Sequence, residues 1–334
     1  MKKILLTGGL GYIGSHVCIE LINRNYDVVI IDNLSNSDIS VMDRIEQITG
    51  SRPIFYKNDI NNKLAVKKIF RAHSFYSVMH FAGLKSVSES VRNPLDYYKN
   101  NIDGAINLLG VMEEMGCKSF VFSSSATVYE KTQDVPLKES SKLSASNPYG
   151  QTKLIIEKLL RDIYESDKSW EIAILRYFNP AGAHESGLIG EAPKGIPNNL
   201  FPYIAGVATG RFEKLTIFGN DYDTFDGTGI RDYIHVVDLA KGHINALEAI
   251  GNKSNFLILN LGTGNGYSVL DVLKEFEIVS NKIISHEFVE RRVGDVSKCY
   301  ADISLSLKLL SWRAERDLRK MCSDAWRWEC SRLN

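Results

Sequence analysis

Two residues, Tyr149 and Lys153, stand four positions apart in the stretch NPYGQTK (147–153), so on a helix they would share one face. A phenol is a poor base at neutral pH, but a neighbouring ammonium, or the positive ring of an oxidised nicotinamide, lowers its pKa toward about 7. Such a tyrosine can remove a hydroxyl proton while the carbon beneath it gives a hydride to the cofactor. Ser125, in FSSSATVY, can hydrogen-bond the same oxygen. We predict that Tyr149, Lys153 and Ser125 are catalytic.

The glycine-rich stretch TGGLGYIG (7–14) lies between a predicted strand and a predicted helix. Glycines permit a tight turn and close approach to a pyrophosphate, and the helix N-terminus adds free N–H groups and a positive dipole end. Asp32 ends the second predicted strand, where a carboxylate accepts hydrogen bonds from ribose hydroxyls and repels a 2′-phosphate. These features predict an NAD site. The alternative for Tyr149 and Lys153, an exposed pair on an amphipathic helix, is disfavoured beside such a site.

Short apolar runs alternate with longer amphipathic segments through the first half of the chain. We expect strands at 4–6, 28–31, 54–56, 78–82, 119–124 and 172–178, and helices at 15–25, 63–73, 96–115 and 149–167. This alternation indicates a parallel sheet covered on both faces, and right-handed crossovers make it a doubly wound α/β Rossmann fold. Ligands bind outside the carboxyl ends of such strands, so the serines, the tyrosine helix and the glycine turn should converge there.

After residue 180 the sequence becomes rich in loops, with Gly and Pro punctuation in NPAGAHESGLIGEAPKGIPNN. Later segments suggest strands at 215–219 and 257–262, and helices near 200–210, 238–250, 268–280 and 316–329. We therefore predict an NAD-binding Rossmann domain over 1–180 and a smaller mixed α/β substrate-binding lobe over 181–334.

Composition excludes several classes of function. The 334 residues include 40 Lys plus Arg and 40 Asp plus Glu, so no overall basic field favours nucleic acid or an anionic membrane. The five cysteines are odd in number and widely spaced, which disfavours a disulfide framework, and we predict no metal site. The opening MKKILLTGG is too short for a signal peptide, and no apolar run approaches membrane-spanning length. We expect a cytoplasmic protein.

Nine motifs stand in order along the chain: TGGLGYIGSH, DNLSNS, HFAGLKSVSESV, SSSATVY, YFNPAGAH, GIPNNL, GNDYDTFDGTGIRDYIHVVDLA, NLGTG and RRVGD. With them the chain resembles, over nearly its whole length, the UDP-glucose (UDP-galactose) 4-epimerase family of the extended short-chain dehydrogenase/reductase superfamily. One departure is Glu130, which stands where the family usually has glycine after ATVY. This departure bears on the conformation of the local turn more than on the catalytic chemistry.

The resemblance implies two sets of binding residues. The NAD set is Gly8, Gly11, Tyr12, Ile13, Gly14, Asp32, Asn33, Asn36, Ser37, Asp59, Ile60, Phe81, Ala82, Lys85, Asn100, Tyr149, Lys153 and Phe178. The UDP-sugar set is Ser125, Asn179, Asn199, Leu200, Leu215, Phe218, Arg231, Tyr233, Arg292, Asp295 and Cys299. Guanidinium groups suit this role because they grip phosphate oxygens through paired donors. The alternative for Arg231 and Arg292 is an ordinary surface ion pair.

The activity that the resemblance implies is NAD-dependent 4-epimerisation of UDP-hexoses through a transient 4-keto sugar, by a homodimer formed through helices near 95–115 and 150–167. The alternatives are a dehydratase or decarboxylase on the same scaffold, or a non-catalytic NAD-binding protein. Related dehydratases carry an acidic residue just after the catalytic serine, but here Ala126 and Thr127 follow it, and neither is an acid or base at neutral pH. The intact serine, tyrosine and lysine disfavour a non-catalytic protein.

Cys299 lies close in sequence to Arg292 and Asp295. In the family that the chain resembles, this position is a wall of the sugar pocket: a tyrosine crowds the 2′ substituent, and a small residue admits an N-acetyl group. Cysteine is compact and weakly polar. We therefore predict that UDP-GlcNAc and UDP-GalNAc are substrates together with UDP-glucose and UDP-galactose. The alternative is a cysteine that serves packing alone.

Overall fold

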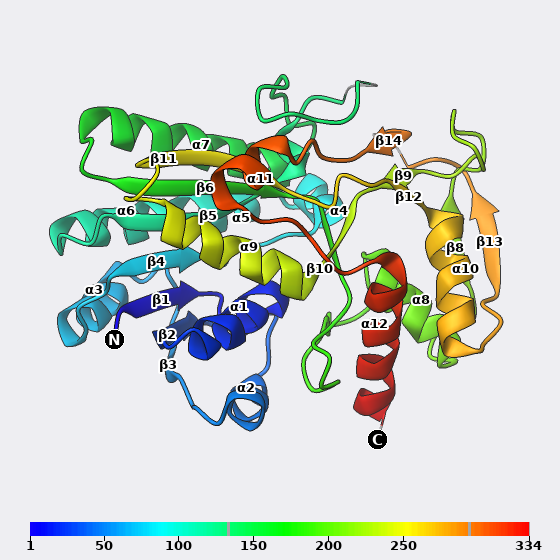
Figure 1. Ribbon diagram of the computed structural model, residues 1–334, viewed down its shortest axis with the longest axis horizontal. Helices are drawn as coiled ribbons and strands as arrows, with labels where there is room; N and C mark the ends of the chain where they lie inside the picture. Colours follow the sequence, from blue (N-terminus) through cyan, green and yellow to red (C-terminus); the bar gives the residue numbers. More distant parts are fainter. Residues whose placement is uncertain (132–133, 293–294, 334) are drawn as a thin grey trace.

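The computed structural model describes residues 1–131, 134–292 and 295–333 (Figure 1). Its centre is a seven-stranded parallel sheet in the order β11-β6-β5-β4-β1-β2-β3. The strands are β1 (Lys3–Thr7), β2 (Asp27–Asp32), β3 (Ile54–Lys57), β4 (Ser77–His80), β5 (Ser119–Ser125), β6 (Glu171–Tyr177) and β11 (Phe256–Leu261). This order is that of a doubly wound Rossmann sheet, which confirms the predicted α/β class.

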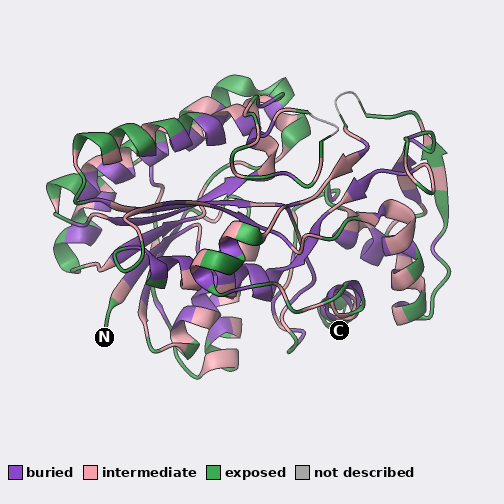
Figure 2. Cartoon of the chain, turned by 45° about the horizontal axis from the view of Figure 1, so that its top comes forward, coloured by how far each residue is buried: buried purple, intermediate pink, exposed green. Residues whose placement is uncertain are grey.

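The central strands are apolar along their length because helices cover both faces of the sheet (Figure 2). Neighbouring residues of β1 show this plainly: Leu5 and Leu6 are both fully buried, but in different cores. Leu6 packs with side chains of α1 (Tyr12–Asn23), and Leu5 packs with side chains of α6 (Gly104–Glu114). Successive side chains of a strand point to opposite faces, so one apolar run supports two layers.

The other helices of the first half are α2 (Val41–Thr49), α3 (Lys63–Ala72), α4 (Val87–Arg92), α5 (Pro94–Tyr98) and α7 (Pro148–Ser166), with a 3-10 turn η2 (Ala126–Val128). The helix expected at 96–115 is interrupted by a π-helical turn, η1 (Lys99–Asp103), between α5 and α6. Asn101 in this turn donates to the Leu84 carbonyl and to the Thr152 hydroxyl, both at 3.1 Å. The irregular turn thus ties the loop after β4 to α7.

The later part of the chain forms a smaller lobe, on the right of Figure 1. Its elements are β7 (Asn179–Ala181), α8 (Leu200–Ala208), β8 (Leu215–Phe218), β9 (Ile230–Arg231), β10 (Tyr233–His235), β12 (Tyr267–Ser268), α10 (Val269–Ser280), β13 (His286–Val289), β14 (Lys298–Cys299) and α12 (Leu318–Leu333). The strands pair as β10–β7, β12–β9–β14 and β13–β8. A separate apolar core, which includes Phe201, Phe276 and Met321, holds these elements together.

The segment expected at 257–262 does not belong to the smaller lobe, contrary to our prediction. It is β11, which pairs in parallel with β6 at the edge of the large sheet. The helix before it, α9 (Val236–Ala249), covers the same face as α1, and α11 (Ser304–Leu310) packs on α9. A near-continuous apolar strand suits a sheet that is buried on both faces. A division of the chain at residue 180 stays a prediction.

Candidate functional site

The glycine turn after β1 forms a cradle that side chains would fill. Gly8 has a φ of 69°, and a Cβ there would lie 2.7 Å from the Ala82 nitrogen. A Cβ on Gly14 would lie 2.4 Å from the Gly8 carbonyl oxygen. Gly11 begins α1 without a side-chain cap, so the first N–H groups of the helix are open to a ligand. The turn therefore fits a dinucleotide pyrophosphate.

Asp32 faces this turn from the end of β2. Its carboxylate accepts hydrogen bonds from the Leu10 N–H at 3.1 Å, the Leu34 N–H at 2.9 Å and the Ser37 hydroxyl at 2.7 Å. Beyond it, the Asn33 amide donates to Asp59 at 2.8 Å. Acidic oxygens at this position suit ribose hydroxyls and repel a 2′-phosphate, so the chain's own residues fit NAD.

The remaining predicted cofactor residues also gather at the carboxyl ends of the strands. Phe81 and Ala82 directly follow β4, and the Phe81 N–H donates to the Thr7 carbonyl at 2.9 Å. Phe178 directly follows β6, and Asn100 lies in η1. Asn36 lies in the loop after β2, and the buried Ile60 lies after β3. The structure brings these residues to one edge, and their contacts with the cofactor stay predictions.

The amino end of α7 positions the predicted catalytic pair. Pro148 opens the helix, and the Asn147 side chain caps it by accepting from the Gly150 N–H at 2.9 Å. Tyr149 and Lys153 follow one turn apart and are only 7% and 5% exposed. The Lys153 ammonium lies 5.9 Å from the centroid of the Tyr149 ring. The expectation of one shared helical face is confirmed.

Burial controls the acidity of this pair. It raises the pKa of Tyr149 to about 12, against a hydrogen bond with Ser125 that lowers it. Burial also lowers the pKa of Lys153 to about 8. In the protein without cofactor, burial outweighs the effect of Lys153 on the pKa of Tyr149, and the expectation that Lys153 and the oxidised nicotinamide ring together lower it stays a prediction. A further positive charge beside Tyr149 is needed.

Thr127 supports the predicted catalytic serine. Its N–H and its hydroxyl both donate to the Ser125 hydroxyl, at 3.2 and 3.0 Å. A hydroxyl that orients Ser125 thus occupies the place where related dehydratases are expected to have an acid.

Two predicted diphosphate ligands, Arg231 and Arg292, lie in the smaller lobe without a carboxylate partner among the residues that the structure describes. The Arg292 guanidinium lies 3.8 Å from the centroid of the Phe218 ring. Its neighbour Arg291, by contrast, forms a surface ion pair with Asp221 at 2.7 Å. Among the described residues, Arg231 and Arg292 therefore do not form the surface ion pairs of the alternative, and both guanidinium groups remain free to bind phosphate oxygens.

Other predicted sugar residues lie on neighbouring elements. Asn179 on β7 is the register partner of Tyr233 on β10, and Asn199 and Leu200 begin α8. Leu215 is packed inside the small core, so its side chain is not open to a ligand. In the RRVGD motif, Arg292 and Asp295 are described and residues 293–294 lie outside the described part of the chain.

Glu130 fits its turn without strain. Its N–H donates to the Lys142 carbonyl at 2.9 Å, and its carboxylate pairs with the Lys142 ammonium at 2.8 Å. Glu130 is not among the described residues with positive φ, so the backbone here does not require glycine. The departure at this position leaves the turn intact.

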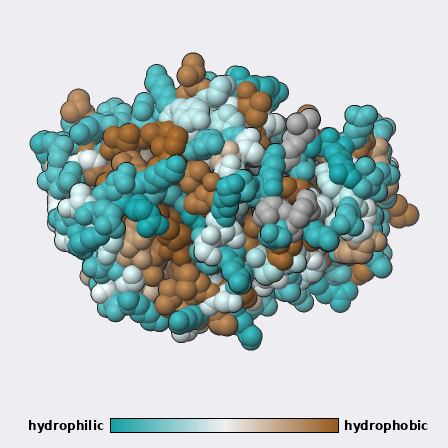
Figure 3. Space-filling view, turned by 90° about the horizontal axis from the view of Figure 1, so that it is seen from above, coloured by the Kyte–Doolittle hydropathy of each residue, from teal (hydrophilic) through white to brown (hydrophobic). Residues whose placement is uncertain are grey.

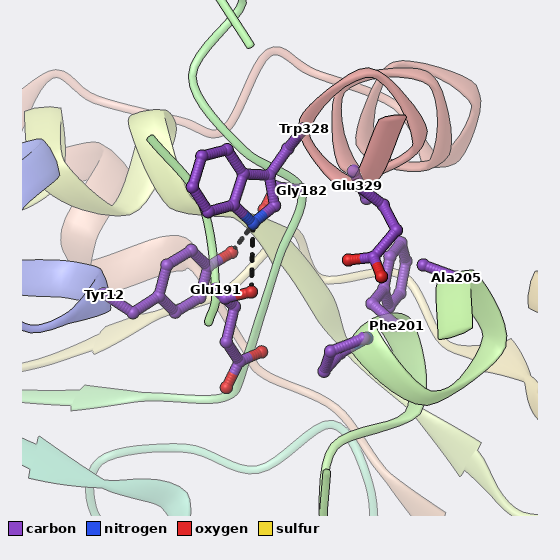
Figure 4. A pocket seen from close by; sticks show the side chains of 9 residues that line it. Tyr12, Gly182, Glu191, Phe201, Ala205, Trp328 and Glu329 are labelled. Carbon is purple, nitrogen blue, oxygen red and sulfur yellow. Dashed lines mark hydrogen bonds between the residues drawn. The ribbon is translucent and has the colours of Figure 1, made fainter. Parts of the chain in front are cut away.

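Glu191 is a site residue that the sequence did not reveal. One oxygen of its carboxylate accepts from Lys85 at 3.0 Å and from Asn199 at 2.6 Å, so it links a predicted cofactor residue to a predicted sugar residue. Its carbonyl accepts from the Trp328 indole at 3.0 Å, beside the Tyr12 hydroxyl, in the hollow drawn in Figure 4. Glu191 lies in a loop without periodicity, so no sequence pattern marks it. Glu157 was also missed, although its spacing of four from Lys153 was visible.

Metal and thiol chemistry find no support at this site. Over the described ranges, no group of three or more His, Cys, Asp or Glu side chains is arranged to hold a metal ion. All five cysteines are free, and desolvation raises the pKa of the Cys299 thiol to about 11, so it is not a thiolate at neutral pH. None of the helices in the described residues is both long and apolar enough to cross a membrane.

Comparisons with known proteins agree with this geometry. Residues 4–262 match the model of the NAD dependent epimerase/dehydratase family. A UDP-glucose 4-epimerase of Bacillus subtilis is 53% identical over 331 residues, which covers 99% of this chain and 98% of that protein. A Stenotrophomonas maltophila UDP-glucose 4-epimerase, crystallised with NAD and formylated UDP-arabinopyranose, superposes with a TM-score of 0.98 at 47% identity, over 100% of this chain and 99% of the other. A Bifidobacterium longum UDP-glucose 4-epimerase with NAD⁺ and UDP gives 0.96 at 46% identity, with coverage of 100% and 99%.

Proposed function

The chain belongs to the NAD dependent epimerase/dehydratase family and catalyses NAD-dependent 4-epimerisation of UDP-hexoses, and we propose that Tyr149, Lys153 and Ser125 carry its proton chemistry. The observation that supports these roles is the burial of the three side chains close to one another at the carboxyl end of β5, on the same edge of the sheet as the glycine turn after β1.

In the proposed reaction, Lys153 supplies a positive charge that favours the Tyr149 phenolate, and the other residues have tasks of their own. When bound, NAD would supply the acceptor for the hydride from C4 and, once reduced, the donor that gives the same hydride back to C4, and its oxidised ring would add a positive charge near Tyr149. Tyr149 takes the proton of the sugar 4′-hydroxyl, with Ser125 hydrogen-bonded to the same oxygen. Arg231 and Arg292 hold the diphosphate while the 4-keto sugar turns about its bond to it. Tyr149 then returns the proton to the sugar, now presented by its opposite face.

The experiment that tests this function is an interconversion assay on UDP-glucose and UDP-galactose without added reductant. We expect an equilibrium mixture from either side, no net NADH and retention of deuterium placed at C4. Loss of water or of carbon dioxide from the sugar would identify a dehydratase or a decarboxylase instead. Exchange of the C4 label with solvent would exclude the hydride route.

We also propose that UDP-N-acetylhexosamines are substrates. Cys299 on β14 is half-buried and is the register partner of Arg231 on β9, which supports a place beside the sugar nucleotide. Its side chain is small and uncharged, so it leaves room for a 2′ N-acetyl group. A parallel assay on UDP-GalNAc and UDP-GlcNAc tests this range.

We further propose a homodimer formed through α5, α6 and α7, in the cytoplasm. Figure 3 views the molecule from the side of α7 and shows apolar surface gathered on that face. Exposed apolar side chains on these three helices include Leu95, Ile106 and Ile155. Such a patch is typical of an interface between copies of a chain. Light scattering on the purified protein should give twice the 37.5 kDa mass of the chain.

The five free cysteines suit a reducing compartment, which supports the proposed cytoplasmic location.

A further inference from the structure

A buried ion pair lies directly behind the catalytic residues. Glu157 is one helical turn beyond Lys153 on α7, and its side chain is 4% exposed. Arg176 of β6, with a side chain 2% exposed, grips this carboxylate at both oxygens, with its Nε at 3.0 and 3.2 Å and its Nη2 at 2.6 Å. Removing two charges from water is costly, so a fully buried pair at this place is not explained by stability alone.

The serine run of β5 fastens the same helical face. The Ser123 carbonyl accepts from the Lys153 ammonium at 2.8 Å, and the Ser124 hydroxyl donates to the Glu157 carboxylate. The next serine, Ser125, hydrogen-bonds Tyr149. Three consecutive residues of β5 therefore each contact one residue of α7, and those three, Tyr149, Lys153 and Glu157, are spaced four apart on one helical face.

Arg176 is also held by hydrogen bonds to residues other than Glu157. Its Nη1 donates to the Tyr129 hydroxyl at 3.2 Å and to the Glu139 carbonyl at 3.0 Å, and Tyr129 in turn donates to Asn260 of β11 at 2.6 Å. These hydrogen bonds orient the guanidinium toward the Glu157 carboxylate.

The titratable and charged groups around Lys153 come from α7, β4, β6 and α9. They are Tyr149, Glu157, His80, Arg176, Tyr177 and His243. Burial lowers the pKa of His80 to about 3 and that of His243 to about 4, and it raises the pKa of Tyr177. These three groups are neutral at working pH. Within this set, Glu157 is the carboxylate that opposes the effect of burial on Lys153.

We propose that Glu157 is a positioning residue for the epimerisation: its carboxylate, held by Arg176 and Ser124 one helical turn from Lys153, keeps the Lys153 ammonium charged for its action on Tyr149. The inference rests on the roles proposed above for Tyr149 and Lys153. Without the carboxylate, burial favours the neutral amine, and Tyr149 loses the positive charge that favours its phenolate.

The test is the pH profile of kcat for wild type, Glu157→Gln and Glu157→Asp, with Glu165→Gln as the matched control. Glu165 is an exposed carboxylate on the same helix and pairs with Lys168 at the surface. We expect Glu157→Gln to move the alkaline limb of the kcat profile toward acid by about one pH unit. At a fixed pH above the limb, kcat should therefore be about tenfold lower than in the wild type, and KM should be unchanged. Glu157→Asp should restore the wild-type limb, and Glu165→Gln should not move it. Lower activity with an unmoved limb would reduce Glu157 to a structural role and overturn the proposal.

Glu157→Gln leaves Arg176 buried without its anion, which is strongly destabilising. The double variant Glu157→Gln with Arg176→Met removes both charges and should move the limb in the same direction but by less, because loss of the Arg176 cation partly offsets loss of the carboxylate. An unmoved limb in the double variant would overturn the proposal as well. Wild-type turnover and a Tyr149→Phe control in the same assays distinguish failure of the proposed catalytic roles from failure of the Glu157 proposal. An active Tyr149→Phe variant would contradict the proposed function. An unmoved limb, with normal wild-type turnover and an inactive Tyr149→Phe variant, would contradict only the role of Glu157.

Discussion

Cys299 and Arg231 are register partners in the parallel pair β14–β9, so the half-buried thiol and a predicted diphosphate ligand lie side by side. Under the substrate range proposed above, a bulky side chain in place of Cys299 would narrow the sugar pocket at this point.

We expect Cys299→Tyr to reduce kcat/KM for the UDP-N-acetylhexosamines by about 100-fold or more, because a clash with the 2′ substituent costs several kcal/mol. Turnover of UDP-glucose and UDP-galactose should stay within about threefold, because a plain hexose carries only a hydroxyl at C2 and does not meet the new ring. Steady-state kinetics on all four substrates measure both effects. Cys299→Ser is the matched control and should retain all four. Equal losses on both pairs would contradict a pocket wall.

Tyr149→Phe removes the phenol oxygen and keeps the packing of the ring. We expect kcat to fall by about 10²- to 10⁴-fold, the usual contribution of a general acid–base group. NAD content and the thermal midpoint should stay close to those of the wild type. Tyr164→Phe, later on the same helix, should have normal turnover. Near-normal activity of Tyr149→Phe would remove this residue from the mechanism.

Gly14→Ala tests the cradle, because the new Cβ would lie 2.4 Å from the carbonyl oxygen of Gly8. Overpacking of this kind costs about 1–3 kcal/mol, and the shifted turn should no longer hold the pyrophosphate. Gly110→Ala on α6 is the control, since the nearest atom to its Cβ would be the flexible end of Lys63 at 3.7 Å. Urea denaturation and the NAD content of the purified protein give the readouts. The cradle would be refuted if Gly14→Ala bound NAD normally.

His80 should make stability depend on pH. Burial lowers its pKa to about 3 in the folded protein, against about 6.5 in the unfolded chain. The unfolded chain therefore binds the proton first as the pH falls below 6.5, and the free energy of unfolding drops by up to about 1.4 kcal/mol per pH unit from this group. Between pH 6.5 and 5, the free energy of unfolding of His80→Asn should fall less steeply with decreasing pH than that of the wild type, by the amount that binding of about one proton contributes. His286→Asn, at an exposed position, should keep the slope. Identical slopes in His80→Asn and wild type would contradict the assignment.

The sequence was sufficient for those parts of the fold that short-range patterns encode. The apolar runs around Leu5 and Phe120 and the amphipathic pattern of 149–167 predicted their strands and helix correctly, because each depends on neighbours within a few residues. The run at 257–262 was recognised as a strand but assigned to the wrong sheet. Its apolar pattern does not say which strand it pairs with, and only the path of α9 brings it to β6.

Long-range geometry accounts for what was missed in the site. Glu191 joins Lys85 and Asn199 across a loop, and the π-helical turn at Asn101 depends on Leu84 and Thr152, which come from two other segments. The spacing of Tyr149 and Lys153 was sufficient to pair them, but it could not show that burial would dominate the acidity of both. Burial is a property of the folded chain as a whole.

The late arrival of β11 has a consequence for biosynthesis. A ribosome that has made only the first 180 residues has produced six of the seven strands, with the apolar β6 as an open edge. Until residues 256–261 emerge, that edge offers free N–H and C=O groups to any other nascent strand. A fragment truncated at residue 180 would keep this edge for good, and in a concentrated preparation it would form aggregates by adding copies of itself along β6.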